Sequence, residues 1–301
     1  MNLLTRSDFD GLACAVLLKD IGIISSVKFV HPKDMQDGLI KVTSNDVLAN
    51  VPYVEGCGLW FDHHTSEEER LGKEDFLFTG SLQYLDSAAH VVYDYYKDKH
   101  DLSKFDEMIE SVDKVDAAKL SVDEILHPKN WILLGYIMDP RTGLGRFRDF
   151  TISNYQLMEK LIDVCRAQSI KQILEDPDIQ ERVEIYEEHF SLFVDMIRVH
   201  SYTKGNVIVS DLRGVDPIYA GNRFAVYALY PNQNVSMWIV DRGGADCPIA
   251  VGHSIVNRSS KANVGHILLS YGGGGHDQVG TCQVPPGDCD RVINELIDKL
   301  Q

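Results

Sequence analysis

The feature that most constrains the fold is an alternation of short apolar runs with helical spacing over residues 1 to about 65. The apolar runs predict strands at 3–4, 27–30, 39–42 and 58–61, and the spacing between the first two predicts a helix over 12–21. Strands that alternate with helical crossovers are typical of a parallel sheet, because each crossover returns the chain to the same edge. We therefore expect an α/β N-terminal domain built on a parallel sheet.

The pattern changes twice further along the chain. The spacing becomes helical and predicts helices over 87–97, 105–115, 122–136, 152–170 and 179–199. After a turn at 202–206, strands are predicted at 207–209, 224–229, 235–240 and 249–251, and helices at 265–269 and 292–300. We expect a first domain over 1–200, which ends in long bridging helices, and a smaller α/β domain over 203–301.

Length and charge limit the possible functions. A chain of 301 residues has room for about two ordinary domains. A net charge of −16 argues against an electrostatic grip on long duplex DNA, although a bound metal can reverse the local potential for a small anionic substrate. The sequence has neither a leader pattern nor an apolar stretch long enough to span a bilayer, so we expect a cytoplasmic protein with no membrane partner.

The cysteines give little sign of a cross-linked framework. Six are scattered along the chain and none forms a CxxC pair. This pattern predicts reduced thiols rather than disulfides or a zinc site.

An apolar run at 58–61 ends in Asp62, His63 and His64. Open α/β sheets bind ligands at the carboxyl ends of their strands. If the chain stays extended, the two imidazoles point to opposite faces, so that one can ligate a metal while the other meets a substrate. Asp62 is placed to orient a ring. The alternative is a polar loop with two surface histidines.

Asp8 and Asp10 directly follow the first predicted strand. Residues two apart in an extended segment share a face, and two acids at one point favour Mn²⁺ or Mg²⁺. The alternative is that Asp10 only caps the following helix.

Two further acids are candidates by position. Asp46 follows the strand predicted at 39–42, so we expect it to leave the sheet at the same edge as Asp8 and Asp62, where a carboxylate could bridge two ions. Asp113 and Asp116 are three apart on a predicted helix and share a face, and we expect one of them to be a ligand. Solvated helix acids are the alternative for this pair.

Near the C-terminus, four glycines at 272–275 end in His276, and Arg258 lies upstream. Backbone N–H groups in such a run can cradle an anion, with Arg258 and His276 as charged donors. The alternative is a flexible loop.

Taken together, three motifs resemble those of the DHH phosphoesterase superfamily with its associated C-terminal domain. They are Ser7-Asp8-Phe9-Asp10-Gly11, Asp62-His63-His64 and Gly273-Gly274-Gly275-His276, and they span nearly the whole chain. The chain is most similar to the branch described as exopolyphosphatase-related or short-oligoribonucleotide phosphodiesterase. The resemblance implies a hydrolase with one or two Mn²⁺ ions, for which Mg²⁺ or Co²⁺ could substitute, and a site in the cleft between two domains.

The resemblance also implies roles for single residues. Asp8 would ligate one metal and Asp10 the other, and the remaining metal ligands would be Asp46 as the bridge, His63 and Asp116, with Asp113 as the runner-up. His64 would contact the scissile phosphate and Asp62 would support a histidine ring. Substrate phosphate would be held by Arg258 and His276, beside a pocket lined by Gly273, Gly274 and Gly275.

One position departs from the family pattern. Many members carry a histidine ligand four residues before the first acid, where this chain has Leu4. Arg6 cannot replace it as a ligand, because a guanidinium does not deprotonate. The first metal would then depend on water, on another side chain or on substrate.

The resulting hypothesis is in-line hydrolysis of phosphodiester bonds in short oligoribonucleotides or cyclic (di)nucleotides by metal-activated water. One alternative is an exopolyphosphatase or pyrophosphatase, and another is a catalytically weak nucleotide-binding sensor. An aromatic shelf, for which Tyr219 and Tyr271 are candidates, would favour a nucleotide, whereas a cationic channel would favour polyphosphate. The long bridging helices could also support a homodimer.

Overall fold

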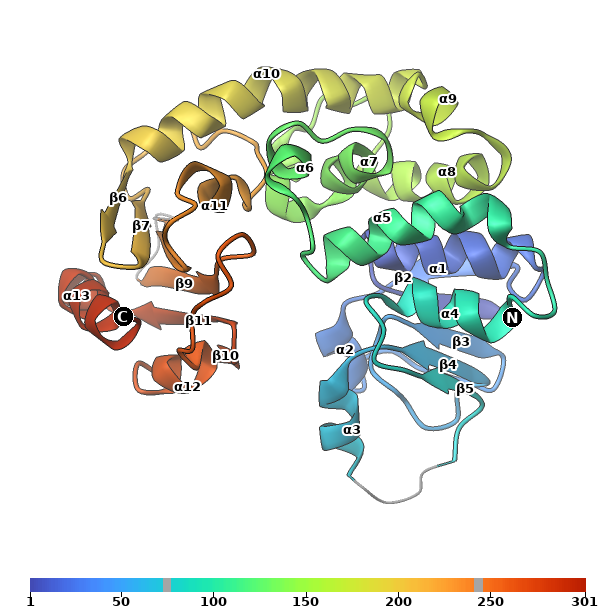
Figure 1. The fold of residues 1–301 in the computed structure, drawn as a ribbon. Helices are drawn as coiled ribbons and strands as arrows, with labels where there is room; N and C mark the ends of the chain where they lie inside the picture. The colour runs from blue at the N-terminus through green and yellow to red at the C-terminus, as the bar shows by residue number, and fades with distance from the viewer. Residues whose placement is uncertain (73–76, 241–245) are drawn as a thin grey trace. The chain divides into compact units, whose positions relative to one another are not determined.

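The computed structural model describes residues 1–72, 77–240 and 246–301. The chain divides into two compact units, each with a sheet of its own (Figure 1). The first unit comprises Met1–Lys119, Pro128–Pro140 and Leu144–Glu184, and the second comprises Leu120–His127, Arg141–Gly143 and Ile185–Gln301. Within the described ranges, no helix combines the length and the apolar character that crossing a bilayer requires.

The first unit contains a five-stranded parallel sheet in the order β2-β1-β3-β4-β5. Its strands are β1 (Asn2–Thr5), β2 (Ser26–Phe29), β3 (Asp46–Ala49), β4 (Leu59–Asp62) and β5 (Gly80–Leu82). The central strands are short apolar runs with a parallel neighbour on each side, which is the usual setting for buried α/β strands. The predicted parallel sheet is thus confirmed.

The third predicted strand is wrong. Leu39 is 71% exposed, and the third strand is the buried run Asp46–Ala49, which pairs with β1 on one side and β4 on the other. Two short apolar runs lie close together here, and periodicity cannot choose between them, whereas pairing on both edges does. The correction matters for the site, because Asp46 begins a strand instead of following one.

Helices cover both faces of this sheet. Figure 1 shows α1 (Phe9–Asp20), α4 (Ala88–Tyr96) and α5 (Asp106–Asp116) together on one side, where α1 packs against both of the others. Apolar residues of α2 (Pro32–Gln36) and α3 (Thr65–Leu71) pack with Leu4, Leu48 and Trp60 from the opposite face. Ten consecutive residues of α1 are buried, so this helix lies inside the unit.

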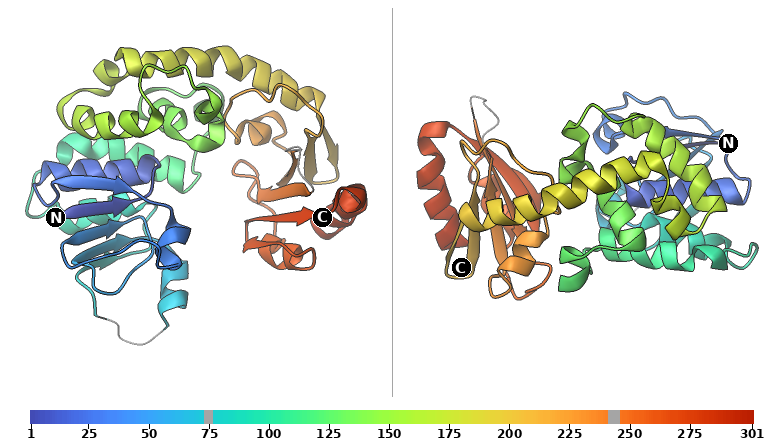
Figure 2. Two further views of the ribbon diagram at one scale, coloured as in Figure 1. Left: turned by 180° about the vertical axis from the view of Figure 1, so that it is seen from behind. Right: turned by 90° about the horizontal axis from the view of Figure 1, so that it is seen from above.

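The remaining helices follow the predicted helical stretch. They are α6 (Val122–Leu126), α7 (Asn130–Met138), α8 (Asn154–Ala167), α9 (Ile170–Leu174) and α10 (Pro177–Val199), with 3₁₀ turns at Ser103–Phe105, Pro140–Thr142, Leu144–Arg146 and Pro286–Asp288. The helix predicted over 122–136 is divided at Pro128, since proline disfavours helical geometry in the residue before it. The long helix α10 (Figure 2) belongs to the first unit up to Glu184 and to the second unit from Ile185.

The second unit contains a six-stranded mixed sheet in the order β10-β11-β9-β8-β7-β6, in which β7 and β8 pair in parallel. The strands are β6 (Ser201–Lys204), β7 (Val207–Asp211), β8 (Val235–Ile239), β9 (Cys247–His253), β10 (Gly274–His276) and β11 (Val279–Val284). One face packs its valines and isoleucines against α12 (Val264–Leu269) and α13 (Cys289–Lys299). The expected second α/β unit is therefore present.

The strand predicted over 224–229 is wrong, because α11 (Ala225–Leu229) occupies this segment. The turn before it is fixed by Asn222, whose side-chain oxygen accepts the N–H of Phe224 at 2.9 Å. This Asx turn bends the chain directly before Phe224, the N-cap residue of α11, and such a local side-chain bond competes with an extended strand.

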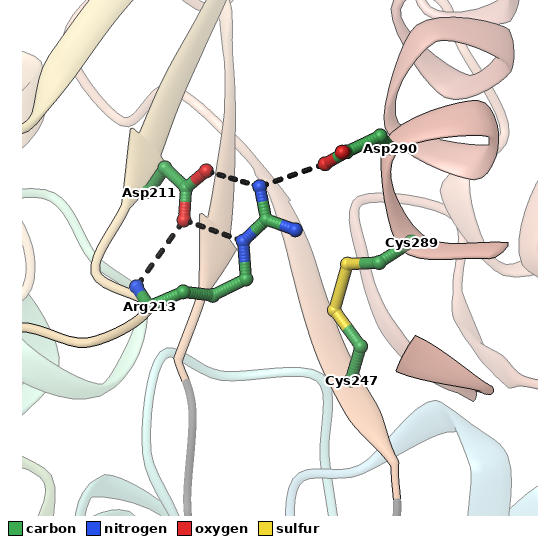
Figure 3. Close-up of a disulfide and its surroundings, with 5 residues drawn as sticks. All are labelled: Asp211, Arg213, Cys247, Cys289 and Asp290. Atoms are coloured by element: carbon green, nitrogen blue, oxygen red, sulfur yellow. Dashed lines mark hydrogen bonds and ion pairs between the residues drawn. A yellow bond between two sulfur atoms is a disulfide. The ribbon is translucent and has the colours of Figure 1, made fainter. Parts of the chain in front are cut away.

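A disulfide joins Cys247 at the start of β9 to Cys289 at the start of α13, with Cα atoms 6.1 Å apart (Figure 3). The expectation that all cysteines are reduced is therefore wrong for this pair, while Cys14, Cys57, Cys165 and Cys282 are free thiols. The two partners are 42 positions apart, so only the fold could reveal them. Beside the disulfide, Arg213 bridges Asp211 and Asp290 at 2.6 and 2.8 Å (Figure 3).

Candidate active site

Three of the predicted metal ligands meet beyond the carboxyl ends of β1 and β4. Asp10 lies in the first turn of α1, His63 follows β4, and Asp116 ends α5. The Nε2 atom of His63 is 3.8 Å from Oδ2 of Asp10 and 3.3 Å from Oδ2 of Asp116. One potential ligand atom from each residue lies within 4.8 Å of the other two. The fold thus gathers two carboxylates and an imidazole at one point.

The tautomer of His63 suits a metal. Its Nδ1 atom is 3.2 Å from the carbonyl oxygen of Leu85, and a carbonyl only accepts, so Nδ1 carries the proton. Nε2 is then the ring nitrogen that can ligate a metal, and it faces Asp10 and Asp116. It is buried and has no hydrogen-bond partner within the described part of the chain. Two carboxylate oxygens and one imidazole nitrogen form a donor set that fits a divalent ion.

Asp10 is held rigidly. Its two oxygens accept the N–H groups of Ala88 at 3.0 Å and Ala89 at 2.7 Å, at the start of α4. Burial raises the pKa of Asp10 well above its ordinary value, and the charges of Asp116 and Asp8 raise it further. A cation bound between Asp10 and Asp116 would favour the ionised form instead.

Asp62 and His64 form a second pair beside this cluster. The Nδ1 atom of His64 donates to Oδ1 of Asp62 at 2.8 Å, and the same oxygen accepts the N–H of His63. Burial of the ring opposes protonation, but the bond to Asp62 outweighs it and raises the pKa of His64 to about 9. The side chain of His64 is 44% exposed. The ring is therefore mostly a cation at neutral pH, and it is accessible to an anion.

The two imidazoles do not point to opposite faces as expected. Their centroids are 4.3 Å apart in an edge contact. The reason is that β4 ends at Asp62 and the chain turns into α3, with His64 as its N-cap residue. The alternation of an extended strand no longer applies there.

Asp8 differs from Asp10 in its partners. One oxygen accepts the N–H of Gly11 at 2.9 Å and the side-chain amide of Asn50 at 3.0 Å, and the other lies 3.0 Å from Nε of Arg6. Asp8 therefore caps α1 and forms an ion pair with Arg6.

The expected position of Asp46 is wrong. Asp46 is the first residue of β3 and pairs in register with Asn2, so it lies at the amino edge of the sheet. Its carboxylate accepts the N–H and hydroxyl of Thr43 at 2.7 and 2.8 Å, and the amide of Asn2 at 3.2 Å. All strands of this sheet are parallel, so the edge that carries Asp8 and Asp62 is the opposite one. Asp46 cannot bridge ions there.

Sequence reasoning missed Asn50, which stands at the carboxyl end of β3. It is buried, has a φ of 56°, and donates to Asp8. Asparagine tolerates this left-handed conformation better than most residues. The signal that could have found it is a polar residue directly after the fully apolar run 47–49.

The structure also separates Asp113 from Asp116. The two oxygens of Asp113 accept from the hydroxyl of Ser87 at 2.6 Å and pair with Nδ1 of His90 at 2.7 Å. Asp116, one turn later at the end of α5, is the acid that faces His63.

The remaining predicted residues belong to the second unit. His276 ends β10, and both His276 and Arg258 are exposed. The N–H of Gly273 donates to the carbonyl of Leu268 in α12, and a Cβ at Gly275 would overlap the carbonyl oxygen of Val279 in β11. The expectation that the N–H of Gly273 faces an anion is thus wrong, since this glycine run allows close packing of β10.

A cavity of about 240 Å³ lies next to the Arg6–Asp8 segment, within the first unit. Ser7 lines it together with the ends of α7 and α8, which contribute Met138, Leu157 and Met158. Its walls are mainly apolar.

No family model and no curated protein matches the chain. Among solved structures, the pGpG-specific phosphodiesterase PggH from Vibrio cholerae is 44% identical over 99% of this chain and 98% of its own, with a TM-score of 0.88. The chain belongs to the DHH phosphoesterase superfamily. Two more distant solved structures share its fold. An exopolyphosphatase-related protein from Bacteroides fragilis is 12% identical, with a TM-score of 0.52 over 99% of this chain and 91% of that one. RecJ from Thermus thermophilus, solved with Mn²⁺, is 9% identical, with a TM-score of 0.53 over 99% of this chain and 51% of that one.

As a DHH phosphoesterase, the chain is a metal-dependent hydrolase. The cluster of Asp10, His63 and Asp116 is a group of side chains that could hold the metal, and a second such group is formed by Asp62, His63 and His64. The ring of His64 belongs to the second group and packs edge-on against His63, which both groups share.

Proposed function

We propose that this chain is a Mn²⁺-dependent phosphodiesterase that hydrolyses linear dinucleotides such as pGpG and other short oligoribonucleotides. The observation that carries the proposal is the 44% identity to the pGpG-specific enzyme over 99% of the chain. The cluster of Asp10, His63 and Asp116 supports it, because hydrolysis of a phosphodiester at neutral pH needs a strong electrophile and an activated water.

The side chains have distinct roles in this proposal. Asp10, His63 and Asp116 hold the metal, which when bound lowers the pKa of a water and polarises a phosphoryl oxygen. His64 offers a positive N–H to a non-bridging oxygen, and charge that develops there is stabilised by a donor already in place. Asp62 keeps the His64 ring oriented and protonated through its bond to Nδ1.

The cavity next to Ser7 favours a nucleotide over an inorganic chain. Apolar side chains of Met138, Leu157 and Met158 suit the faces of a base, whereas polyphosphate would require cationic walls. The aromatic shelf considered for Tyr271 is less well supported, because its ring packs under Nζ of Lys299 at 4.6 Å and its hydroxyl donates to Glu295. Tyr219 packs edge-on against His189.

We assign residues 1–200 to a metal-binding domain and residues 203–301 to a substrate-binding domain. The exposed cations Arg258 and His276 are the proposed contacts to substrate phosphate, next to Gly274 and Gly275. Their loss is expected to raise KM more than it lowers kcat.

The test is product formation from pGpG, a longer oligoribonucleotide and polyphosphate, each with Mn²⁺, Mg²⁺ or Co²⁺. Asp116→Asn serves as the inactive variant and Asp113→Asn, on the same helix, as its matched control. Among the substrates we expect the dinucleotide to be cleaved fastest, and among the ions we expect Mn²⁺ to give the highest rate. Release of phosphate from polyphosphate alone would contradict the proposal, as would binding of nucleotide without turnover.

A further inference from the structure

The ion pair between Arg6 and Asp8 changes what the site can hold. Asp8 is the acid expected at a first metal, yet it belongs to neither of the clusters that could hold an ion among the described residues. Its oxygens instead meet Nε of Arg6 at 3.0 Å, the amide of Asn50 at 3.0 Å and the N–H of Gly11 at 2.9 Å. The guanidinium of Arg6 therefore already supplies a positive charge next to the acid at which the first metal was expected.

We propose that this chain binds one divalent cation, at Asp10, His63 and Asp116, and that the guanidinium of Arg6 replaces a second cation beside Asp8. The inference rests on the proposed function for the identity of the substrate, but not for the number of ions. It assigns to Arg6 a direct contact with a substrate phosphoryl oxygen.

The surroundings of Asp8 lack the ligands that a second ion requires. Leu4, on β1 below this segment, is aliphatic and buried. Asn50 must present its NH₂ group to Asp8, because a carboxylate only accepts, so the amide oxygen points elsewhere. Asp46 lies at the opposite edge of the sheet. A divalent ion needs several oxygen or nitrogen ligands, and Asp8 alone cannot provide them.

Arg6 has the properties that a substitute for a metal needs. Its charge is permanent, and the guanidinium carries a planar set of N–H donors that matches phosphate oxygens. The pair with Asp8 engages Nε, and the terminal N–H groups are suited to donate to an anion. The side chain is 44% exposed, so a substrate can reach it. Asp8, fixed by Asn50 and by the start of α1, is the positioning residue for Arg6.

The number of bound ions tests the proposal without substrate. Purified protein is dialysed against excess Mn²⁺, the bound metal is counted by mass spectrometry, and the spin resonance spectrum is recorded. We expect one ion per chain with the hyperfine pattern of isolated Mn²⁺, for the wild type and for Arg6→Lys. Two ions per chain with an exchange-coupled spectrum in the wild type would overturn the proposal.

A variant designed to gain the second metal site provides the converse test. The double variant Arg6→Ala/Asn50→Asp removes the competing cation and adds a carboxylate next to Asp8, and we expect it to bind a second Mn²⁺. Arg213→Ala, which breaks an arginine–aspartate pair in the second unit, is the matched control and keeps one ion. Circular dichroism confirms that each variant is folded. If the folded double variant still binds one ion, the claim that Arg6 occupies the place of a metal is wrong.

Kinetics separate this inference from the proposed function. Arg6→Ala is expected to lower kcat/KM for the dinucleotide by about 100-fold, the effect of losing one donor to a developing charge, with partial recovery in Arg6→Lys. Dinucleotide cleavage by a wild type that binds two ions would refute the inference alone. One bound ion without cleavage of any nucleotide would refute the proposed function alone.

Discussion

The Nε2 atom of His63 lies 3.3 Å from Oδ2 of Asp116, and both face the buried carboxylate of Asp10. His63 follows a strand and Asp116 ends a helix, so the contact depends on the packing of α5 and α1 over the edge of the sheet. The fold therefore brings one imidazole nitrogen and two carboxylates close enough together to share a cation.

The first prediction separates two acids on one helix. Asp116→Asn should lower kcat by about 100-fold or more, because a metal contributes several kcal/mol to stabilising the transition state. Asp113→Asn should keep kcat but lower the free energy of unfolding by about 1–2 kcal/mol, since the amide has one acceptor oxygen where Ser87 and His90 use two. Steady-state kinetics and urea unfolding of both variants provide the check. Equal kcat losses in the two would contradict the assignment of Asp116.

The pair of His90 and Asp113 also gives a pH dependence. The bond to Asp113 raises the pKa of His90 above its ordinary value of 6.5. The resulting stabilisation is complete below the unfolded value and is lost as the pH rises through the folded value. The difference in unfolding free energy between wild type and Asp113→Asn should therefore shrink as the pH rises above neutrality. A difference that grows over this range would refute the argument.

Metal removal should change stability through the same cluster. A ligand at a hundred times its Kd stabilises the folded state by about 2.7 kcal/mol. Mn²⁺ should accordingly raise the Tm of the wild type, and a chelator should reverse the rise. His63→Ala should show neither change, while Arg213→Ala should respond like the wild type. A Tm rise in His63→Ala equal to that of the wild type would place the ion elsewhere.

Asp46 is predicted to be structural. Burial disfavours its charge, but the bonds from Thr43 and Asn2 outweigh burial and lower the pKa below its ordinary value of 3.8. This stabilisation is present above that value and is lost as the pH falls through the lower, folded value. Asp46→Asn should keep one bound Mn²⁺ and cost about 1–3 kcal/mol at neutral pH, because the new NH₂ group faces donors. The loss of unfolding free energy should become smaller in acid. If Asp46→Asn no longer bound Mn²⁺, Asp46 would be a metal ligand after all.

The cavity predicts a way to change substrate preference. Met138, half-buried at the end of α7, lines its wall. Met138→Trp should fill part of the space, raise KM for the dinucleotide and leave hydrolysis of a chromogenic phosphodiester with a small leaving group unchanged. An unaltered KM in the folded variant would show that no base enters this cavity.

The N-terminal half of the site could be predicted from local sequence. A short apolar run that ends in Asp62, His63 and His64, and another that ends in Asp8 and Asp10, specify strands with polar carboxyl ends. Parallel topology then carries both ends to one edge, because every crossover returns the chain in the same direction. The family was suggested separately, by the resemblance of these motifs and of Gly273–His276 to those of the DHH superfamily.

Other features depended on contacts between distant segments. The run 46–49, and not 39–42, became the third strand because β1 and β4 pair with it on both sides, and this moved Asp46 away from the site and Asn50 into it. Asp116 was separated from Asp113 by the partners that the fold provides, Ser87 and His90. Spacing along a chain gives the direction of a side chain relative to its own element. Which groups it meets is decided when elements pack, because burial and pairing are properties of the whole tertiary structure.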